Sequence, residues 1–378
     1  MKNNYYRIRK KIVVIPIVSL VSNYAREACK QNKGLEFVNI SPIRGLNNHD
    51  SSLQKKIINS IISHPNISGA LLVTNDHKSS QDYKNNIKFF KKPVETISLL
   101  GSKGFKKFFI NSKKKINKIK LKLKNKNNKK KKDFSLSNLC VALECGGSDQ
   151  TSGLFTNPVI CIFVDYLIEN NATVIISETA EFIGTENIIK KSTTNKIIAK
   201  KIINRIKLKN YLMIKSGIDY KGINPTEENL NEGITTLVEK SLGAIKKAGK
   251  CNFTGFLEYA EKPKKPGLYF MDTPFYTPIS FTGLMGAGSH VNLFGMGSFN
   301  PSSNPIVPTI RICSNPNTIK RWGNKIDVDL SYYFKKGNLG LAYKKLKEHF
   351  IKIIKGKLTI SEKEKSGEII VPTSSFPL

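Results

Sequence analysis

The chain has 378 residues, 39% of them hydrophobic, and a formal net charge of +34. This length exceeds the size at which a single hydrophobic core keeps growing, so we expect two domains. No window approaches the roughly 18 to 20 consecutive apolar residues of a membrane span, which argues against a membrane protein. The six cysteines lie far apart, without zinc-site spacing or disulfide density, and this favours a reducing, cytoplasmic location.

A charge of +34 ordinarily indicates a polyanionic partner such as nucleic acid or a membrane surface. Here the excess is mostly lysine, mixed with asparagine and isoleucine and spread along the chain with few aromatic residues. That pattern is also typical of an AT-rich genome that drifts towards lysine codons at exposed sites. We therefore expect neither nucleic acid nor a membrane as the partner.

Residues 1–112 predict an N-terminal α/β domain. The basic residues ahead of Ile12–Ile17 superficially resemble a secretory signal, but Pro16 interrupts the apolar run and no small-residue cleavage site follows. A buried first strand is the better interpretation. The expected strands are Lys11–Val18, Leu35–Ile40, Gly69–Thr74 and Val94–Leu99. The expected helices are Asn23–Gln31, Ser51–Ser63, Gln81–Phe90 and Lys103–Lys122.

Residues 113–135 form a lysine-rich segment that we expect to separate two domains. Ile116, Ile119 and Leu123 fall at helical spacing, so its first part predicts a surface helix. The rest, which includes the run Lys129–Lys132, predicts a solvated linker. Nucleic-acid binding by this tract is the alternative.

Residues 136–378 predict a second, C-terminal α/β domain, which makes the fold two α/β domains with mainly parallel sheets. The expected strands are Leu139–Leu143, Thr173–Ser177, Gly267–Met271, Val291–Phe294 and Thr309–Ile312. The expected helices are Pro158–Glu169, Glu186–Lys207, Thr235–Ala248 and Leu339–Ile354.

A glycine-rich cluster follows the first strand of this domain, where open α/β sheets place their ligands. Paired glycines let backbone N–H groups approach an anion, and a following helix N-terminus adds partial positive charge. This predicts a substrate-binding loop for a carboxylate, although such loops are often only tight turns. The candidate substrate-binding residues are Gly146, Gly147, Ser148, Thr151, Ser152 and Asn157.

Carboxylates follow two further strands. Glu178 and Glu181 come after the second strand, and Asp272 with Thr273, a further substrate-binding candidate, comes after the third. Such carboxylates can act as acid and base or bind a divalent cation, whereas the alternative is that they cap helices or turns. We expect the catalytic set to converge on one cleft, with Glu178 and Asp149 as metal ligands. That set is Asp149, Glu178, Glu181 and Asp272.

Together these clusters resemble the altronate and galactarate dehydratase family, to which the large subunit of sulfolactate sulfo-lyase also belongs. The resemblance covers residues 137–329 closely, and the first half of the chain only in outline. The matching blocks are CGGSDQTSGLFTNP from Cys145, ISETAEFIGTE from Ile176, GITTLVEKSLGAIKKAG from Gly233, EYAE from Glu258 and GLYFMDTP from Gly267.

The chain departs from the family pattern at four places. Ser41 lies where many members have a histidine near a Gly-Cys pair. His77 lies where many members have a Gly-Cys-Glu element. Asn187 replaces the usual histidine after the acidic cluster, and Met296 replaces a polar residue between glycines. These departures concern the substrate and the activity rather than the fold.

The resemblance implies a lyase that eliminates water across C2 and C3 of a sugar acid, giving a 2-keto-3-deoxy acid. A sulfolactate sulfo-lyase that releases sulfite and pyruvate is the close alternative, and a basic nucleic-acid-binding protein on this scaffold is a distant one. The resemblance also implies a divalent metal, iron or manganese.

Single-chain members carry an additional small N-terminal domain, whereas this chain begins within a few residues of its first expected strand. We therefore expect a separate small subunit as a partner, together with homo-oligomerisation.

Overall fold

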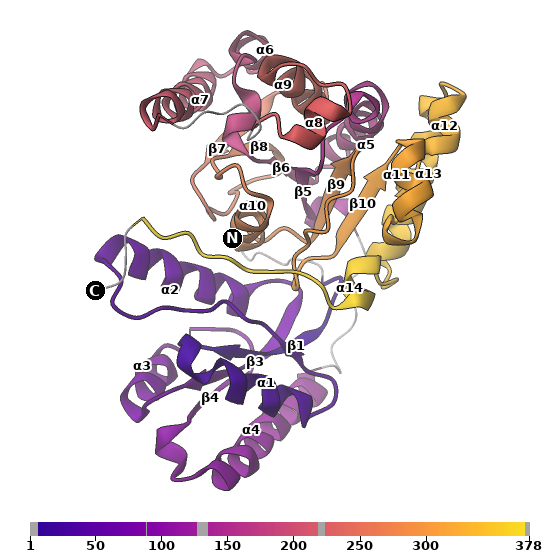
Figure 1. The fold of residues 1–378 in the computed structure, drawn as a ribbon. Helices are drawn as coiled ribbons and strands as arrows, with labels where there is room; N and C mark the ends of the chain where they lie inside the picture. Colours follow the sequence, from indigo (N-terminus) through magenta and orange to yellow (C-terminus); the bar gives the residue numbers. More distant parts are fainter. Residues whose placement is uncertain (1–6, 88, 127–134, 218–223, 375–378) are drawn as a thin grey trace. The chain divides into compact units, whose positions relative to one another are not determined.

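The computed structural model describes residues 7–87, 89–126, 135–217 and 224–374. The chain divides into two compact units: an N-terminal unit of Tyr6–Phe134 with the segment from Glu368, and a C-terminal unit of Ser135–Gly367. Each unit contains one sheet of parallel strands with helices packed against it (Figure 1). This confirms the expected fold class of two α/β domains with mainly parallel sheets.

The N-terminal unit has a four-stranded sheet in the order β2-β1-β3-β4, with every pair parallel. Its strands are β1 (Lys11–Pro16), β2 (Glu36–Phe37), β3 (Ile67–Thr74) and β4 (Val94–Ser98). Its helices are α1 (Ser22–Lys30), α2 (Asn48–Ser63), α3 (His77–Ile87) and α4 (Phe105–Lys126). β3 is buried along its whole length, because helices cover both faces of a central parallel strand.

Helix α4 runs through the expected domain boundary at residue 112. Ile116 and Ile119 are fully buried in the core that α1 and α4 share with the sheet. Gly69 of β3 allows this close approach, since a Cβ there would lie 2.7 Å from Cγ2 of Ile119. The segment 113–126 is therefore part of the N-terminal unit. The run Lys129–Lys132 lies outside the described residues.

The C-terminal unit has a seven-stranded parallel sheet in the order β11-β10-β9-β5-β6-β8-β7. Its strands are β5 (Cys140–Cys145), β6 (Thr173–Ile176), β7 (Phe253–Leu257), β8 (Gly267–Met271), β9 (Val291–Met296), β10 (Thr309–Cys313) and β11 (Val328–Asp329). Its helices are α5 (Asn157–Glu169), α6 (Glu186–Lys191), α7 (Lys196–Lys215), α8 (Glu227–Asn231), α9 (Leu237–Ile245), α10 (Thr277–Gly286), α11 (Pro316–Trp322), α12 (Ser331–Lys335), α13 (Leu339–Ile354) and α14 (Ile360–Glu364).

Two local features of this unit differ from the expectation. The single helix expected at Glu186–Lys207 is divided into α6 and α7, because Asn195 caps α7 by accepting hydrogen bonds from the N–H groups of Ile197 and Ile198. The edge strand β7 was not expected, since its central Gly255 weakens the strand pattern. That glycine lets the ring of Tyr269 on β8 lie against it, where a Cβ would come within 2.6 Å of the ring.

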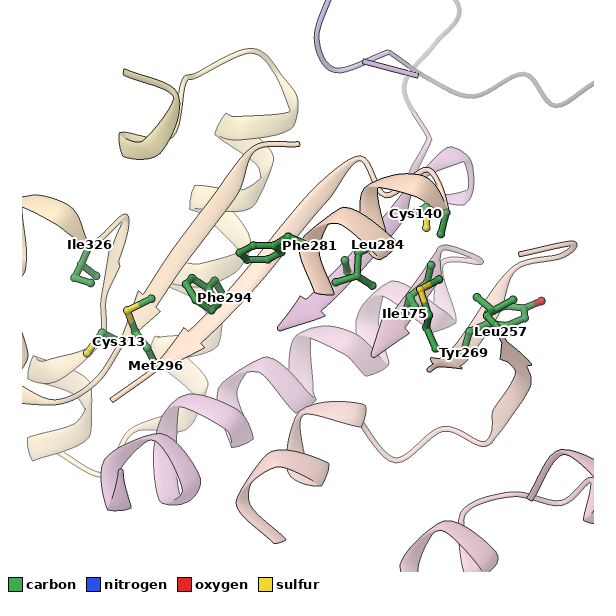
Figure 2. Packing of buried hydrophobic residues seen from close by; sticks show 13 residues of the cluster. Cys140, Ile175, Leu257, Tyr269, Phe281, Leu284, Phe294, Met296, Cys313 and Ile326 are labelled. Atoms are coloured by element: carbon green, nitrogen blue, oxygen red, sulfur yellow. The ribbon is translucent and has the colours of Figure 1, made fainter. Parts of the chain in front are cut away.

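Apolar side chains fill both faces of the seven-stranded sheet. Figure 2 shows one face, where Phe281 and Leu284 of α10 pack with Phe294 and other strand residues. The other face is covered by α5, whose Phe163 contacts Phe350 of α13 with ring centroids 4.9 Å apart. The stretch Ser152–Glu169 is long and apolar enough to cross a membrane, but half of it is buried inside the unit, as in a core helix.

The order of strands reverses at β5, which lies between β6, the next strand along the chain, and β9, a much later one. Ligands of open α/β sheets bind at the carboxyl ends of the strands beside such a reversal. The loops after β5, β6, β8 and β9 are therefore the place to look for a site.

Candidate active site

The carboxyl ends of β5, β6 and β8 bring buried carboxyl groups together. Glu144 is on β5, and Glu178 and Glu181 follow β6; each is at most 3% exposed. Glu144 Oε2 accepts hydrogen bonds from Ser177 Oγ at 2.6 Å and from Ser280 Oγ at 2.8 Å. Glu178 accepts one from the Cys145 N–H at 3.4 Å. The carboxyl groups of Glu144 and Glu178 thus lie next to each other, where few hydrogen-bond donors are available.

The surroundings of Glu144 and Glu178 raise the pKa of both carboxyl groups. Burial raises the pKa of Glu144 to about 7. Burial and then the negative charge of Glu144 raise the pKa of Glu178 well above its ordinary value. The Oε1 of Glu144 is buried and has no hydrogen-bond partner within the described chain. Two adjacent buried carboxyl groups with raised pKa values are suited to acid–base chemistry.

The backbone at Glu178 has an unusual conformation for a residue other than glycine. Its φ of 68° and ψ of 68° lie in the left-handed region. The Glu178 N–H donates to Oγ1 of Thr273 at 2.8 Å, and the Thr179 N–H donates to the Thr273 carbonyl at 3.3 Å. The loop after β8 thus holds the loop after β6 in place. Such strain costs on the order of 1 kcal/mol or more and is concentrated at functional sites.

Two buried lysines accompany Glu181. Lys240 of α9 lies 3.6 Å from Glu181 Oε1, and Lys247 lies 4.0 Å from Oε2. Burial by itself lowers the pKa of Lys247, but Cys145 and the carboxylates of Glu181 and Glu178 reverse the sign and raise it. The two lysines bring positive charge to the buried carboxyl groups. A buried cluster of charges requires such compensation.

A cavity of about 440 Å³ lies beside this cluster. Lys240 lines it and also contacts Glu181, so it joins the cavity to the carboxyl groups. Ser148 lines it too, and its Oγ lies 3.3 Å from the sulfur of Cys145. Four residues of the predicted site line this cavity: Ser148, Asp149, Ser152 and Asn157.

Asp149 lines the cavity, but its carboxylate is already engaged. The Ser152 N–H donates to Oδ1 at 2.6 Å, and Asn315 Nδ2 donates to Oδ2 at 2.6 Å. Thr151 Oγ1 adds a bond to each oxygen, at 2.9 and 3.1 Å. Gly297 packs so closely that a Cβ there would lie 1.8 Å from Oδ1. Asp149 therefore anchors the loop after β5 to its neighbours, with Thr151 as one of its donors.

Asp272 is the carboxylate that pairs with cations of α7. It forms an ion pair with Arg205 and lies 3.8 Å from Nζ of Lys209. It also accepts a hydrogen bond from Oγ1 of Thr179, the residue after Glu178, at 2.6 Å. Asp272 is thus next to the acidic loop, but its partners fix it between β8 and α7.

The paired glycines pack against β9. The Gly146 N–H donates to the Gly295 carbonyl at 2.8 Å, and the Gly147 carbonyl accepts from the N–H groups of Gly297 and Ser298. A Cβ at Gly146 would lie 2.7 Å from Cβ of Met296, which is fully buried. The N–H of Gly146 is consequently not available to a substrate carboxylate.

The two expected metal ligands, Glu178 and Asp149, have different surroundings in this arrangement. Asp149 has a donor on each oxygen, whereas burial and the negative charge of Glu144 raise the pKa of Glu178. Within the described residues, no group of three or more His, Cys, Asp or Glu side chains is placed to hold a metal ion. The dependence on iron or manganese that the resemblance implies stays a prediction.

The sequence prediction missed three residues of the cluster: Glu144, Lys240 and Lys247. Glu144 begins the glycine-rich cluster, directly after the expected strand Leu139–Leu143, which is the signal that could have identified it. Lys240 is four residues before the buried Ala244, on the inner face of α9, and a lysine on an apolar face indicates a buried charge.

The family is decided by a comparison with known proteins. A family model described as D-galactarate/altronate dehydratase, C-terminal, matches residues 136–376. The chain belongs to this family. The match contains every residue of the cluster and the cavity, so the D-galactarate/altronate dehydratase region and the candidate active site coincide.

Three relatives of this dehydratase-family chain are lyases by name. Subunit beta of (2R)-sulfolactate sulfo-lyase from Chromohalobacter salexigens is 28% identical over 95% of this chain and 92% of its own length. Altronate dehydratase from Escherichia coli is 33% identical over 64% of this chain, and that from Bacillus subtilis is 28% identical over 82%. The aligned parts cover only 49% and 63% of these two altronate dehydratases.

Proposed function

We propose that this chain is the large catalytic part of a lyase that eliminates a leaving group from C3 of a small 2-hydroxy acid. The observation that carries the proposal is the buried pair of Glu144 and Glu178, both with raised pKa values, beside a cavity lined by Lys240 and Lys246. Membership of a dehydratase family and lyase relatives support the same reaction class.

The reaction requires a base near C2 and an acid near C3. The C2–H bond breaks, the C3–O bond breaks and a C2=C3 double bond forms, so that hydrogen and hydroxide leave as water. The resulting enol tautomerises to a 2-oxo acid. A proton next to a carboxylate is very weakly acidic, so the extra negative charge that develops on the carboxylate needs a fixed cation or donor.

Glu178 is our candidate for both proton transfers. When its proton moves to Glu144, Glu178 becomes a base that can take the C2 proton, and the same proton can then be delivered to the leaving hydroxyl. Lys240 lines the cavity and is our candidate for holding the substrate carboxylate. Glu178 lies one residue behind the cavity wall, since it contacts Cys145 and Cys145 contacts Ser148.

Dehydration of a sugar acid such as altronate or galactarate, giving a 2-keto-3-deoxy acid, is the first candidate. The cavity lining supports it, because Ser148, Ser152, Asn157 and Gln150 offer hydroxyl and amide groups to a polyhydroxylated chain. Catalytic roles for Asp149 and Asp272 stay predictions, and their contacts favour a positioning role.

Sulfite release from sulfolactate, giving pyruvate, is the second candidate. Here the C3–S bond breaks in place of C3–O. The end-to-end match to the sulfo-lyase subunit beta favours it, and Lys246 adds a second cation to the cavity lining, which suits a sulfonate.

A direct assay separates the two candidates. The purified chain is incubated with altronate, galactarate and (2R)-sulfolactate, and both the 2-oxo acid and sulfite are measured. A 2-oxo acid without sulfite from a sugar acid supports dehydration, and sulfite with pyruvate supports the second candidate. If none of the three gives product when the small subunit is also present, the proposed reaction class is wrong.

We also propose that a separate small subunit completes the enzyme, as the name subunit beta indicates for the first relative. The chain alone should then be nearly inactive and gain activity when a partner of about a hundred residues, the size of a small domain, is added. Co-purification should show equal stoichiometry, and full activity of the isolated chain would refute the idea. Homo-oligomerisation, a cytoplasmic location and the divalent metal remain predictions, the last checked by elemental analysis of the purified protein.

A further inference from the structure

We propose that the N-terminal unit carries a binding site for a small, multiply charged, phosphate-bearing anion at the amino-terminal edge of its sheet. This edge is opposite to the one where open α/β sheets usually bind ligands. The proposal is independent of the lyase reaction, since every residue involved lies in the N-terminal unit.

The site is a cavity of about 620 Å³. One wall comes from residues at the beginning of β1, β3 and β4, among them Lys10, Ser68 and Pro93. The other wall comes from the last turns of α4, through Lys120 and Lys124. Gly69 allows this geometry, because a Cβ there would collide with Ile119 of α4 and lie 3.0 Å from the Pro93 carbonyl.

The lining carries a concentrated positive charge. Six cationic side chains line the cavity, and no aspartate or glutamate of the described chain does: Arg7, Lys10, Lys91, Lys92, Lys120 and Lys124. A general excess of surface lysine does not by itself remove carboxylates from one cavity. Nearby carboxylates are held by other lysines, since Glu36 pairs with Lys11 and Glu95 pairs with Lys115, Lys118 and Lys122.

Two of the lining lysines donate to backbone carbonyls. Lys92 donates to the His64 carbonyl, and Lys120 donates to the Lys33 carbonyl at 2.9 Å. These bonds orient the two ammonium groups. An anion in the cavity would meet six cationic side chains and no carboxylate among the described residues that line it.

Ser68 provides the second observation that points to a ligand. Ser68 lines the cavity and is only 4% exposed, yet its hydroxyl has no hydrogen-bond partner within the described chain. A buried hydroxyl without a partner destabilises a fold, so such groups call for an explanation. A phosphate oxygen is an acceptor that this hydroxyl could reach. The cavity volume also falls in the range of small-ligand sites, roughly 300–1,000 Å³.

Calorimetric titration of the full chain with pyrophosphate and with orthophosphate at low salt tests the site. We expect saturable binding, tighter for pyrophosphate because it carries more charge. The double variant Lys120→Gln/Lys124→Gln should bind pyrophosphate at least about tenfold more weakly. The matched control is Lys106→Gln/Lys113→Gln, which removes the same charge from exposed positions of the same helix outside the cavity and should stay within about twofold.

The variant Ser68→Ala distinguishes a built site from diffuse charge. It should weaken pyrophosphate binding about tenfold without lowering the melting temperature, because no internal hydrogen bond is lost. If the double lysine variant does not fold, Ser68→Ala alone tests whether the cavity binds pyrophosphate. Unchanged binding in Ser68→Ala would overturn the proposal, and so would equal losses in the two lysine pairs. Duplex DNA that binds more tightly than pyrophosphate and is equally sensitive to both pairs would show a nucleic-acid surface instead.

Discussion

Two sets of carboxylates occupy the same edge of the C-terminal sheet but differ in their surroundings. Glu144 and Glu178 are buried and have raised pKa values. Asp149 and Asp272 are held by several donors or by cations. All four residues follow or end a parallel strand. Their places in the sequence therefore do not distinguish the two sets. The hydrogen-bond donors and cations around each carboxyl group distinguish a candidate for proton transfer from a carboxylate that anchors a loop.

The difference arises from the directions in which the loops turn. The left-handed conformation of Glu178 directs the loop after β6 towards β5, where hydroxyl groups and another carboxyl are the neighbours. Asp272 instead meets Arg205 and Lys209 of α7. Proton transfer requires a group whose two protonation states are close in free energy, which full pairing with cations prevents.

The largest expected effect comes from Glu178→Gln. Removing a general acid and base should lower kcat by about 10²- to 10⁴-fold. The melting temperature should stay close to that of the natural protein, because the amide of glutamine can donate to Glu144 in place of the protonated carboxyl. Product formation under saturating substrate, together with thermal unfolding, measures both quantities. Activity within tenfold of the unaltered chain would contradict the assignment.

The second expected effect is a pH dependence of stability that Glu144 controls. Its folded pKa of about 7 lies above the ordinary 4.5, so the folded state binds more protons than the unfolded state between these values. The contribution of Glu144 to stability should therefore be largest below about pH 4.5 and fall by about 2 to 3 kcal/mol as pH rises to about 7. Glu178, whose pKa is also raised, adds a fall in the same direction.

Denaturant unfolding at pH 5 and pH 7 measures this fall, and Glu144→Gln should reduce it. Asp327, whose pKa burial raises to about 6, contributes in the same window but is common to both proteins. An identical fall in the variant would show that Glu144 is not the responsible group.

A smaller effect is expected for Asp272→Asn. Loss of the charge partner of Arg205 and Lys209 should cost about 1 to 2 kcal/mol of unfolding free energy, because the lysine and arginine keep some access to solvent. kcat should stay within tenfold. A loss beyond a hundredfold at unchanged stability would move Asp272 from the anchored set into the catalytic one.

The smallest effect is expected for the lysine run. Replacing Lys129–Lys132 with Gln and Ser should leave turnover within a factor of a few, as expected for a charge excess without a catalytic role. The same assay measures it. A loss beyond tenfold, about 1.4 kcal/mol of transition-state stabilisation, would give this segment a part in the reaction.

Much of the fold could be predicted from local patterns. The strand Gly267–Met271 and the helix Leu339–Ile354 have the predicted bounds, because each combines an apolar period with clear ends. The edge strand β7 and the break between α6 and α7 were missed, since a glycine opposite Tyr269 and a capping asparagine act through their neighbours.

The sequence by itself determined the two α/β units, the family and the sheet edge that carries the carboxylates, because buried parallel strands and the motifs after them are local features. Only the tertiary structure decided which carboxyl groups have raised pKa values. Burial, donors and opposite charges set a pKa, and these come from segments far apart in the chain: Ser280 contacts Glu144, Lys240 contacts Glu181, and Asn315 contacts Asp149.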